Sequence, residues 1–164
     1  MKAVTAANGW AYVGTMISHA SYPVIDGGGP ATLSKTILGD FLRGPADMRR
    51  SFGGRDAGGA ATTFAGIDFH GLTVSDAFWT WGATKGLSAI ARQRLMARAF
   101  LAGIDILMVA KTDFSGGWGY FQEIYADMLP VAEQKALVAA TGYASWEDLR
   151  AAFRARITES AARI

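Results

Sequence analysis

Three short apolar segments, each followed by a loop and then a helical pattern, most constrain the fold of this chain. They cover residues 12–17, 72–74 and 104–109. Their apolar residues do not alternate cleanly with polar ones, which is typical of strands covered on both faces. The order strand, helix, strand, helix predicts an α/β fold with parallel strands and right-handed crossovers. We expect one domain, because 164 residues suit a single core.

The helices between these segments are marked by capping residues. The first begins after Ser34 and ends at Gly44, and the second spans 87–102 and ends at Gly103. The second should place Arg94 and Arg98 on its solvent side, opposite its apolar face. The residues expected on that apolar face are Ala89, Ile90, Met96, Ala97, Phe100 and Leu101.

Three further helices are predicted after the last apolar segment, over residues 120–129, 131–140 and 146–155. Pro130 separates the first two, and Ser145 with Asp148 resembles a capping box at the start of the third.

Residues 44–66, called the insertion below, are rich in glycine, alanine and arginine and show no periodic pattern. The insertion enters a strand from a helix, which places it at the end of the sheet opposite the strand ends that carry chemistry. We therefore expect a flexible segment remote from any site.

Two polar residues follow predicted strands directly. Asp76 comes after the segment 72–74 and one serine, and His19 follows the segment 12–17. Catalytic side chains of α/β folds lie at the carboxyl ends of strands. The alternatives stay open here, because Asp76 could cap the following turn and a lone histidine is more often structural.

Aromatic side chains follow the strand ends as well. Trp79 and Trp81 lie close to Asp76 in the sequence, and large flat rings suit the apolar face of a sugar. We expect both on the same face as Asp76. Trp118 and Tyr120 have the same expectation, with ordinary packing at a helix start as the alternative.

Several classes of function are disfavoured. The chain has no cysteine, a net charge of only +2 and no run of Lys and Arg longer than Arg49-Arg50, so we expect neither thiolate chemistry nor nucleic acid as a partner. No His, Asp or Glu pair has metal-ligand spacing, so no metal is expected. The absence of a membrane-span pattern and of a signal peptide predicts a cytoplasmic chain without a membrane partner. Asp105 and His70 are interpreted as structural.

Four sequence blocks in order resemble the catalytic barrel domain of glycoside hydrolase family 3. They are "MISHASYPVID", "GPATLSKTILGDFLRG", "GLTVSDAFWTWGA" and "RAFLAGIDILMV". The first two are more similar to the β-N-acetylhexosaminidase branch than to the β-glucosidase branch. The resemblance implies the last three strand–helix units of a (β/α)8 TIM barrel, so that residues 1–164 form the C-terminal portion of that domain.

The resemblance also implies roles for residues. Asp76 matches the nucleophile of a retaining hydrolase, which attacks the anomeric carbon and forms a glycosyl-enzyme. His19 and Tyr22 match the loop that lines the sugar pocket, and Trp79, Trp81 and Trp118 are expected to shape it. The implied substrates are β-N-acetylglucosaminides or β-glucosides, and no metal or organic cofactor is implied.

The chain departs from the family in three respects, one of which is that Trp79 stands where the family has a small residue after the nucleophile. It carries the insertion, and the family's Lys-His, Gly-His-Gly and Asp-His motifs, the last supplying the acid/base, are missing from it. We therefore expect the isolated chain to be inactive. The alternative function is a non-enzymatic fragment that binds sugar or completes a barrel, with self-association through unfinished barrel edges.

Overall fold

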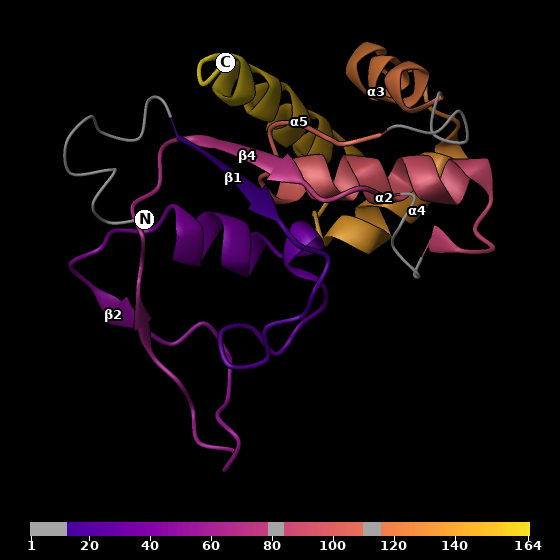
Figure 1. Ribbon diagram of the computed structural model, residues 1–164. Helices are drawn as coiled ribbons and strands as arrows, with labels where there is room; N and C mark the ends of the chain where they lie inside the picture. Colours follow the sequence, from indigo (N-terminus) through magenta and orange to yellow (C-terminus); the bar gives the residue numbers. More distant parts are fainter. Residues whose placement is uncertain (1–12, 79–83, 110–115) are drawn as a thin grey trace.

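The computed structural model describes residues 13–78, 84–109 and 116–164 of a mixed α/β protein (Figure 1). Strands β1 (Gly14–Ile17) and β4 (Leu72–Ser75) pair in parallel, with Ile17 opposite Ser75. The parallel arrangement and the positions of two predicted strands are thus confirmed. Strand β1 begins later than predicted, and residue 12 lies outside the described ranges.

The third predicted strand, over residues 104–109, is wrong as a continuous strand. The segment lies beside β4, but in the described ranges the two share a single bridging pair, Val74 with Ile106. Side chains of β4 take part in the contact: the Met108 N–H donates to the Ser75 hydroxyl at 2.9 Å, and the Asp105 N–H lies 3.0 Å from both the carbonyl and the hydroxyl oxygen of Thr73. A regular ladder needs successive main-chain bonds, so pairing stops after one residue.

The later helices are close to the prediction. They are α2 (Ala89–Ala102), α3 (Gly117–Ala126), α4 (Val131–Thr141) and α5 (Trp146–Ala161). The Ser145 hydroxyl accepts from the Asp148 N–H at 3.0 Å, which confirms the predicted cap of α5. Helix α3 starts three residues before the predicted range, and α5 continues six residues beyond it.

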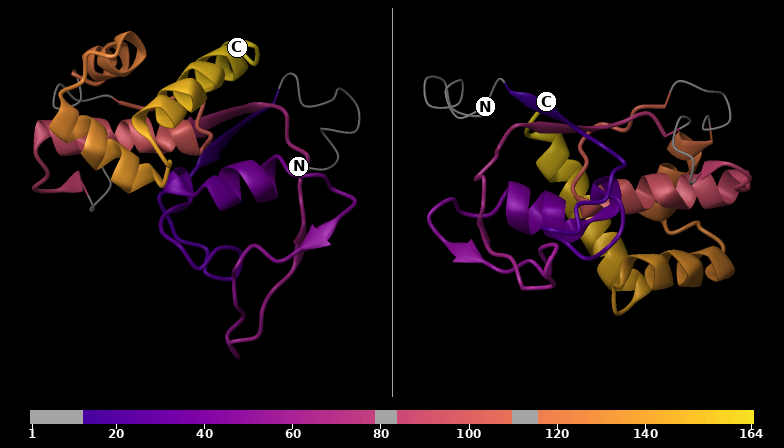
Figure 2. Two further views of the ribbon diagram at one scale, coloured as in Figure 1. Left: turned by 180° about the vertical axis from the view of Figure 1, so that it is seen from behind. Right: turned by 60° about the horizontal axis from the view of Figure 1, so that its bottom comes forward.

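Helices α2 to α5 gather on one side of the molecule in both further views (Figure 2). The C-terminal half of α2 supplies buried residues to two apolar clusters, one shared with α3, α4 and α5 and one with η2 and residues 78 and 104. Ala89 and Ile90 are exposed, contrary to the prediction, because the first turn of α2 projects beyond these clusters.

The loop after β1, residues 18–34, is called the site loop below. It ends in a short 3₁₀ turn η1 (Ala31–Leu33), and the π-helical segment η2 (Thr36–Leu42) follows. The predicted capping residue Ser34 accepts from the Ile37 N–H at 3.0 Å, and Leu38 is fully buried. A helix is therefore present where predicted, but its turns are wider than those of an α-helix.

The insertion is not irregular throughout, contrary to the expectation of a flexible segment. It contains strands β2 (Arg49–Arg50) and β3 (Phe64–Ala65), which pair antiparallel. Its tip contacts the site loop, since the Arg55 N–H donates to the Pro23 carbonyl at 3.0 Å. The hydrophobic pattern could not show this contact, because both partners lie in irregular segments.

Within the described ranges, none of the helices combines the length and the apolar character that a bilayer crossing requires.

Candidate active site

Two side chains that can carry chemistry lie together where β1 and β4 end. Asp76 follows the last residue of β4, and His19 lies two residues beyond Ile17 at the end of β1. The Asp76 N–H donates to the Ile17 carbonyl at 2.9 Å. The Asp76 carboxylate also acts electrostatically on the His19 ring. The structure therefore brings the predicted nucleophile and the predicted pocket histidine together, while their roles stay predictions.

The His19 ring is held in place by a buried threonine. The Thr32 hydroxyl donates its one hydrogen to the Ser18 carbonyl at 2.9 Å, so it accepts from His19 Nδ1, 2.8 Å away. The ring also packs against Phe78, with the two ring centroids 5.2 Å apart. These contacts fix both the orientation of the imidazole and the position of its Nδ1 hydrogen.

The environment of His19 favours its neutral form. Burial lowers the pKa of His19, and this effect exceeds the opposing influence of the Ala77 backbone and the Asp76 charge, both of which raise it. The lowered pKa favours the uncharged imidazole at neutral pH.

The half-buried Asp76 carboxylate is anchored by its own backbone. The Ala77 N–H donates to Asp76 Oδ1 at 2.7 Å. This bond orients the carboxylate at the strand end, as a nucleophile requires, and it is equally the bond expected of an aspartate that stabilises the following turn.

Tyr22 lies at the exposed end of the site loop, and its side chain is 41% exposed. The loop is closed at its base, where the Ala31 N–H donates to the Ala20 carbonyl at 2.9 Å and Ser21 pairs with Pro30. Tyr22 is thus on the same loop as His19, but no contact joins it to Asp76 in the described ranges.

The predicted aromatic residues separate into three groups. Trp79 and Trp81 lie outside the described residues. Tyr120 is buried and its hydroxyl donates to Glu133 Oε1 at 2.7 Å, so ordinary packing accounts for it. Trp118 is 73% exposed and lines an apolar hollow of about 790 Å³ between α3, α5 and the 104–109 segment, whose lining does not include Asp76.

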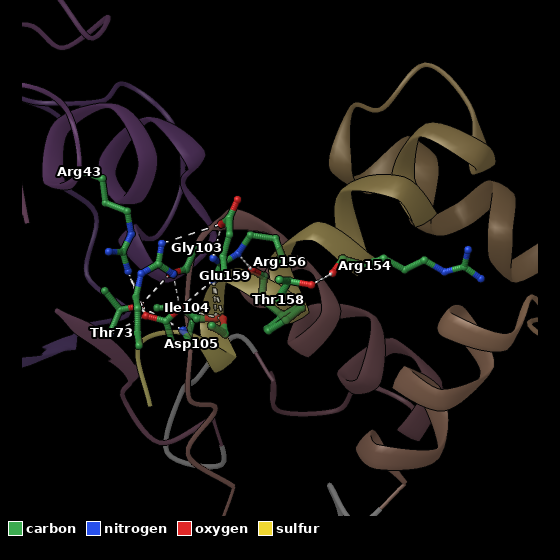
Figure 3. Close-up of polar contacts among 12 residues, drawn as sticks. Arg43, Thr73, Gly103, Ile104, Asp105, Arg154, Arg156, Thr158 and Glu159 are labelled. Atoms are coloured by element: carbon green, nitrogen blue, oxygen red, sulfur yellow. Dashed lines mark hydrogen bonds and ion pairs between the residues drawn. The ribbon is translucent and has the colours of Figure 1, made fainter. Parts of the chain in front are cut away.

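Asp105 has the structural role that the sequence predicts (Figure 3). Its side chain is fully buried, and its carboxylate accepts hydrogen bonds from three arginines, one of which, Arg43, follows η2. Burial raises the pKa of Asp105, but hydrogen bonds and the arginine charges lower it more, so the net pKa is low. The Asp105 cluster consists of the Asp105 carboxylate and the residues that bind it, which are Arg43, Thr73, Arg156, Ser160 and Arg163.

Sequence reasoning missed Thr32, which orients His19, because a threonine thirteen residues away carries no motif that points to such a contact. His70, predicted to be structural, is exposed, and its Nε2 lies 3.0 Å from Asp68 Oδ1. In the described part of the chain, no group of three or more His, Cys, Asp or Glu side chains could hold a metal ion.

The site of this α/β protein therefore lies where two parallel strands end, and it contains a carboxylate and an oriented, neutral histidine. The family described as "Glycosyl hydrolase family 3 N terminal domain" matches residues 4–140. The chain belongs to this family. The match includes the insertion, Asp76 and His19, which confirms the family resemblance found in the sequence.

Among solved structures, a glycosyl hydrolase of the GH3 family from Mycobacterium smegmatis is similar, with 22% sequence identity and a TM-score of 0.47. The match covers 88% of this chain and 37% of that chain, so the protein spans well under half the length of this relative. No curated protein matches the sequence.

Proposed function

We propose that the chain carries the nucleophile half of a retaining glycosidase site and that Asp76 is the nucleophile. The observation that carries this proposal is the position of Asp76 at the carboxyl end of β4, beside His19 at the end of β1, in a chain that belongs to glycosyl hydrolase family 3. Carboxyl ends of parallel strands are where α/β enzymes bind their substrates. We further propose that the chain is the C-terminal part of a (β/α)8 domain.

The proposed reaction has two steps. The Asp76 carboxylate forms a bond to the anomeric carbon while the bond from that carbon to the leaving oxygen breaks, and an acid protonates the leaving oxygen. Water then attacks the same carbon and gives a proton to the conjugate base of that acid, the carboxylate leaves, and the sugar keeps its anomeric configuration. A neutral His19 suits this role of Asp76, because a charged imidazole would make the carboxylate a weaker nucleophile.

The proposed substrates are β-N-acetylglucosaminides or β-glucosides. His19 and Tyr22 on the site loop, with Trp79 and Trp81, are the residues proposed to contact the sugar. This assignment is supported by their place in the family blocks and by the flat apolar surface that aromatic rings offer to a sugar.

Incubation with a 2-deoxy-2-fluoro aryl glycoside, which slows the second step, tests the nucleophile. Peptide mapping by mass spectrometry should find the sugar on Asp76 in the wild-type chain and on no carboxylate in the Asp76→Asn variant. A label on another carboxylate would refute the assignment. Because the isolated chain is expected to react slowly, the labelling is followed over days at high reagent concentration.

The isolated chain should hydrolyse aryl glycosides near the background rate. General acid catalysis contributes roughly 10²–10⁴-fold, and we assign that role to no residue of this chain. Assays of the wild type beside Asp76→Ala test this, and robust turnover that the variant loses would show that the chain does supply an acid.

A second function, completing a barrel with another chain, is favoured by the open edge of the 104–109 segment. In the described ranges, no strand pairs with the side of this segment that faces away from β4. The apolar hollow beside that edge is lined by Leu107, Val109, Trp118 and Ile157. Unpaired edges and apolar hollows favour association. Sedimentation velocity should then show self-association that Trp118→Arg weakens, and a monomer at all concentrations would count against it.

A further inference from the structure

The insertion contacts the site loop through main-chain groups of the loop. The Arg55 N–H donates to the Pro23 carbonyl at 3.0 Å, and the Thr62 hydroxyl donates to the Val24 carbonyl. The Thr62 N–H in turn donates to the Gly54 carbonyl at 3.0 Å. The tip of the insertion is therefore bound to the outer end of the site loop.

Gly54 allows an approach that no other residue would allow. A Cβ atom at this position would lie 2.4 Å from the carbonyl carbon of Val24 and 2.6 Å from that of Ile25. Both obstacles are backbone atoms, which cannot rotate away as the end of a flexible side chain can. The close packing of insertion and loop thus depends on a glycine at position 54.

The insertion is itself anchored to η2, so it can act as a support. Phe52 is 9% exposed and packs edge-on against Phe41 of η2, with ring centroids 5.7 Å apart, and Phe64 packs against the same ring at 6.0 Å. The Arg50 side chain donates to the Asp40 carbonyl at 2.8 Å. Aromatic pairs of this geometry stabilise packing beyond the area they bury.

The other end of the site loop contains His19. Short links close the loop between its outer end and the histidine: Ser21 pairs with Pro30, the Ala31 N–H donates to the Ala20 carbonyl, and Thr32 binds the His19 ring. A shift at Val24 would therefore be transmitted to the residues that orient the imidazole.

We propose that the insertion is a positioning element that holds the site loop, which carries Tyr22, and thereby keeps His19 beside Asp76. Gly54 and Thr62 act as positioning residues through the loop and need not touch a sugar. The statement that the loop faces a sugar rests on the proposed function, whereas the support of the loop by the insertion does not.

NMR spectroscopy of the whole chain tests the proposal, because the chain has only two histidines. In Gly54→Ala, the His19 ring signals should shift and the pKa of His19 should rise towards the ordinary histidine value, as the loop opens to water. The exchange of the Ile25 and Ala31 amide hydrogens should accelerate by roughly tenfold or more. The exposed His70 is the internal reference and should keep its signals.

Matched variants separate positioning from general damage. Gly39→Ala introduces the same methyl group into η2, where nothing lies within 4 Å of the added atom, and should leave His19 unchanged. Thr62→Val removes the hydroxyl that binds Val24, whereas Thr62→Ser keeps it, so only the valine variant should move the His19 signals. The threonine pair decides the question if Gly54→Ala fails to fold.

The proposal is overturned if the His19 signals and the loop amides of Gly54→Ala and Thr62→Val match those of the wild type. It is equally overturned if Gly39→Ala or Thr62→Ser perturbs them as much. The experiment uses no sugar, so its failure is distinguishable from a failure of the proposed glycosidase chemistry, which the labelling of Asp76 tests.

Discussion

Replacing Asp105 by asparagine should strongly destabilise the fold. The carboxylate oxygen Oδ1 accepts from Arg156 and Arg163 at 2.9 and 2.8 Å, and Oδ2 accepts from Arg43 at 3.0 Å. An asparagine of the same shape keeps one acceptor oxygen, replaces the other by an NH₂ donor and removes the negative charge. Arg156 and Arg163 would then share the half-exposed Glu159 carboxylate, whereas Arg43 pairs with no carboxylate other than Asp105 in the described ranges.

The size of the effect follows from burial. Removal of one partner of a buried ion pair costs about 3–5 kcal/mol, because the remaining charge is left uncompensated. The three arginine side chains are 11–20% exposed, so water compensates part of their charge. We therefore expect about 3 kcal/mol, a large share of the roughly 5–15 kcal/mol that stabilises a typical domain.

Urea unfolding followed by far-ultraviolet circular dichroism measures this loss. With a slope of about 2 kcal/mol per molar urea, the midpoint should fall by about 1.5 M at an unchanged slope. Asp68→Asn is the matched control, because Asp68 makes an exposed pair with His70 and has φ 55°, which asparagine also tolerates. A midpoint shift for Asp105→Asn as small as that of the control would refute the reasoning.

The same carboxylate makes stability depend on pH. The folded pKa of Asp105 is lowered, so its contribution is present above the unfolded value of about 3.9 and is lost as the pH falls through the lower folded pKa. The wild type should therefore lose stability more steeply than Asp105→Asn between about pH 5 and pH 2. Parallel curves for the two proteins would contradict this.

Three smaller perturbations have defined outcomes. Asp76→Asn should lower the pKa of His19 further, because the carboxylate charge raises that pKa in the wild type. An NMR titration of His19 measures this, and a rise in its pKa would count against the geometry at the strand ends. Glu133→Gln weakens the two-bond pair with Arg94 and should cost about 2 kcal/mol in urea unfolding; an unchanged midpoint would contradict a structural role. Ser145→Ala removes the cap of α5 and should lower the free energy of unfolding by about 1 kcal/mol in the same assay. An unchanged midpoint would show that the cap does not form in solution.

The parts of the fold that depend on local signals were predictable from the sequence. Apolar segments followed by polar residues indicated β1 and β4, and their parallel order brings Asp76 and His19 together. The Ser145 cap follows a short-range pattern that involves neighbours three residues apart. The family blocks predicted membership that the family match confirms.

The remaining features depend on contacts between distant residues. An apolar run predicts a strand over 104–109, but periodicity carries no information about the hydroxyl groups of Thr73 and Ser75, which also bind main-chain N–H groups of that segment. The support of the site loop by the insertion depends on Gly54 lying against Val24, thirty residues earlier in the chain. A single sequence shows glycine at position 54 but not what lies next to it.

The Asp105 cluster also sets an order for folding. Its carboxylate binds Arg43 from 62 residues before it and Arg163 from 58 residues after it, so closing the cluster joins three distant parts of the chain. Such long-range closures form slowly, since the chain loses loop entropy before the contact stabilises it. During synthesis, the helices α2 to α4 can pack as they emerge, but the buried carboxylate lacks two of its three arginines until residues 156 and 163 have been made. Closure of the cluster therefore waits until the end of α5 and Arg163, which follows the helix, have been made.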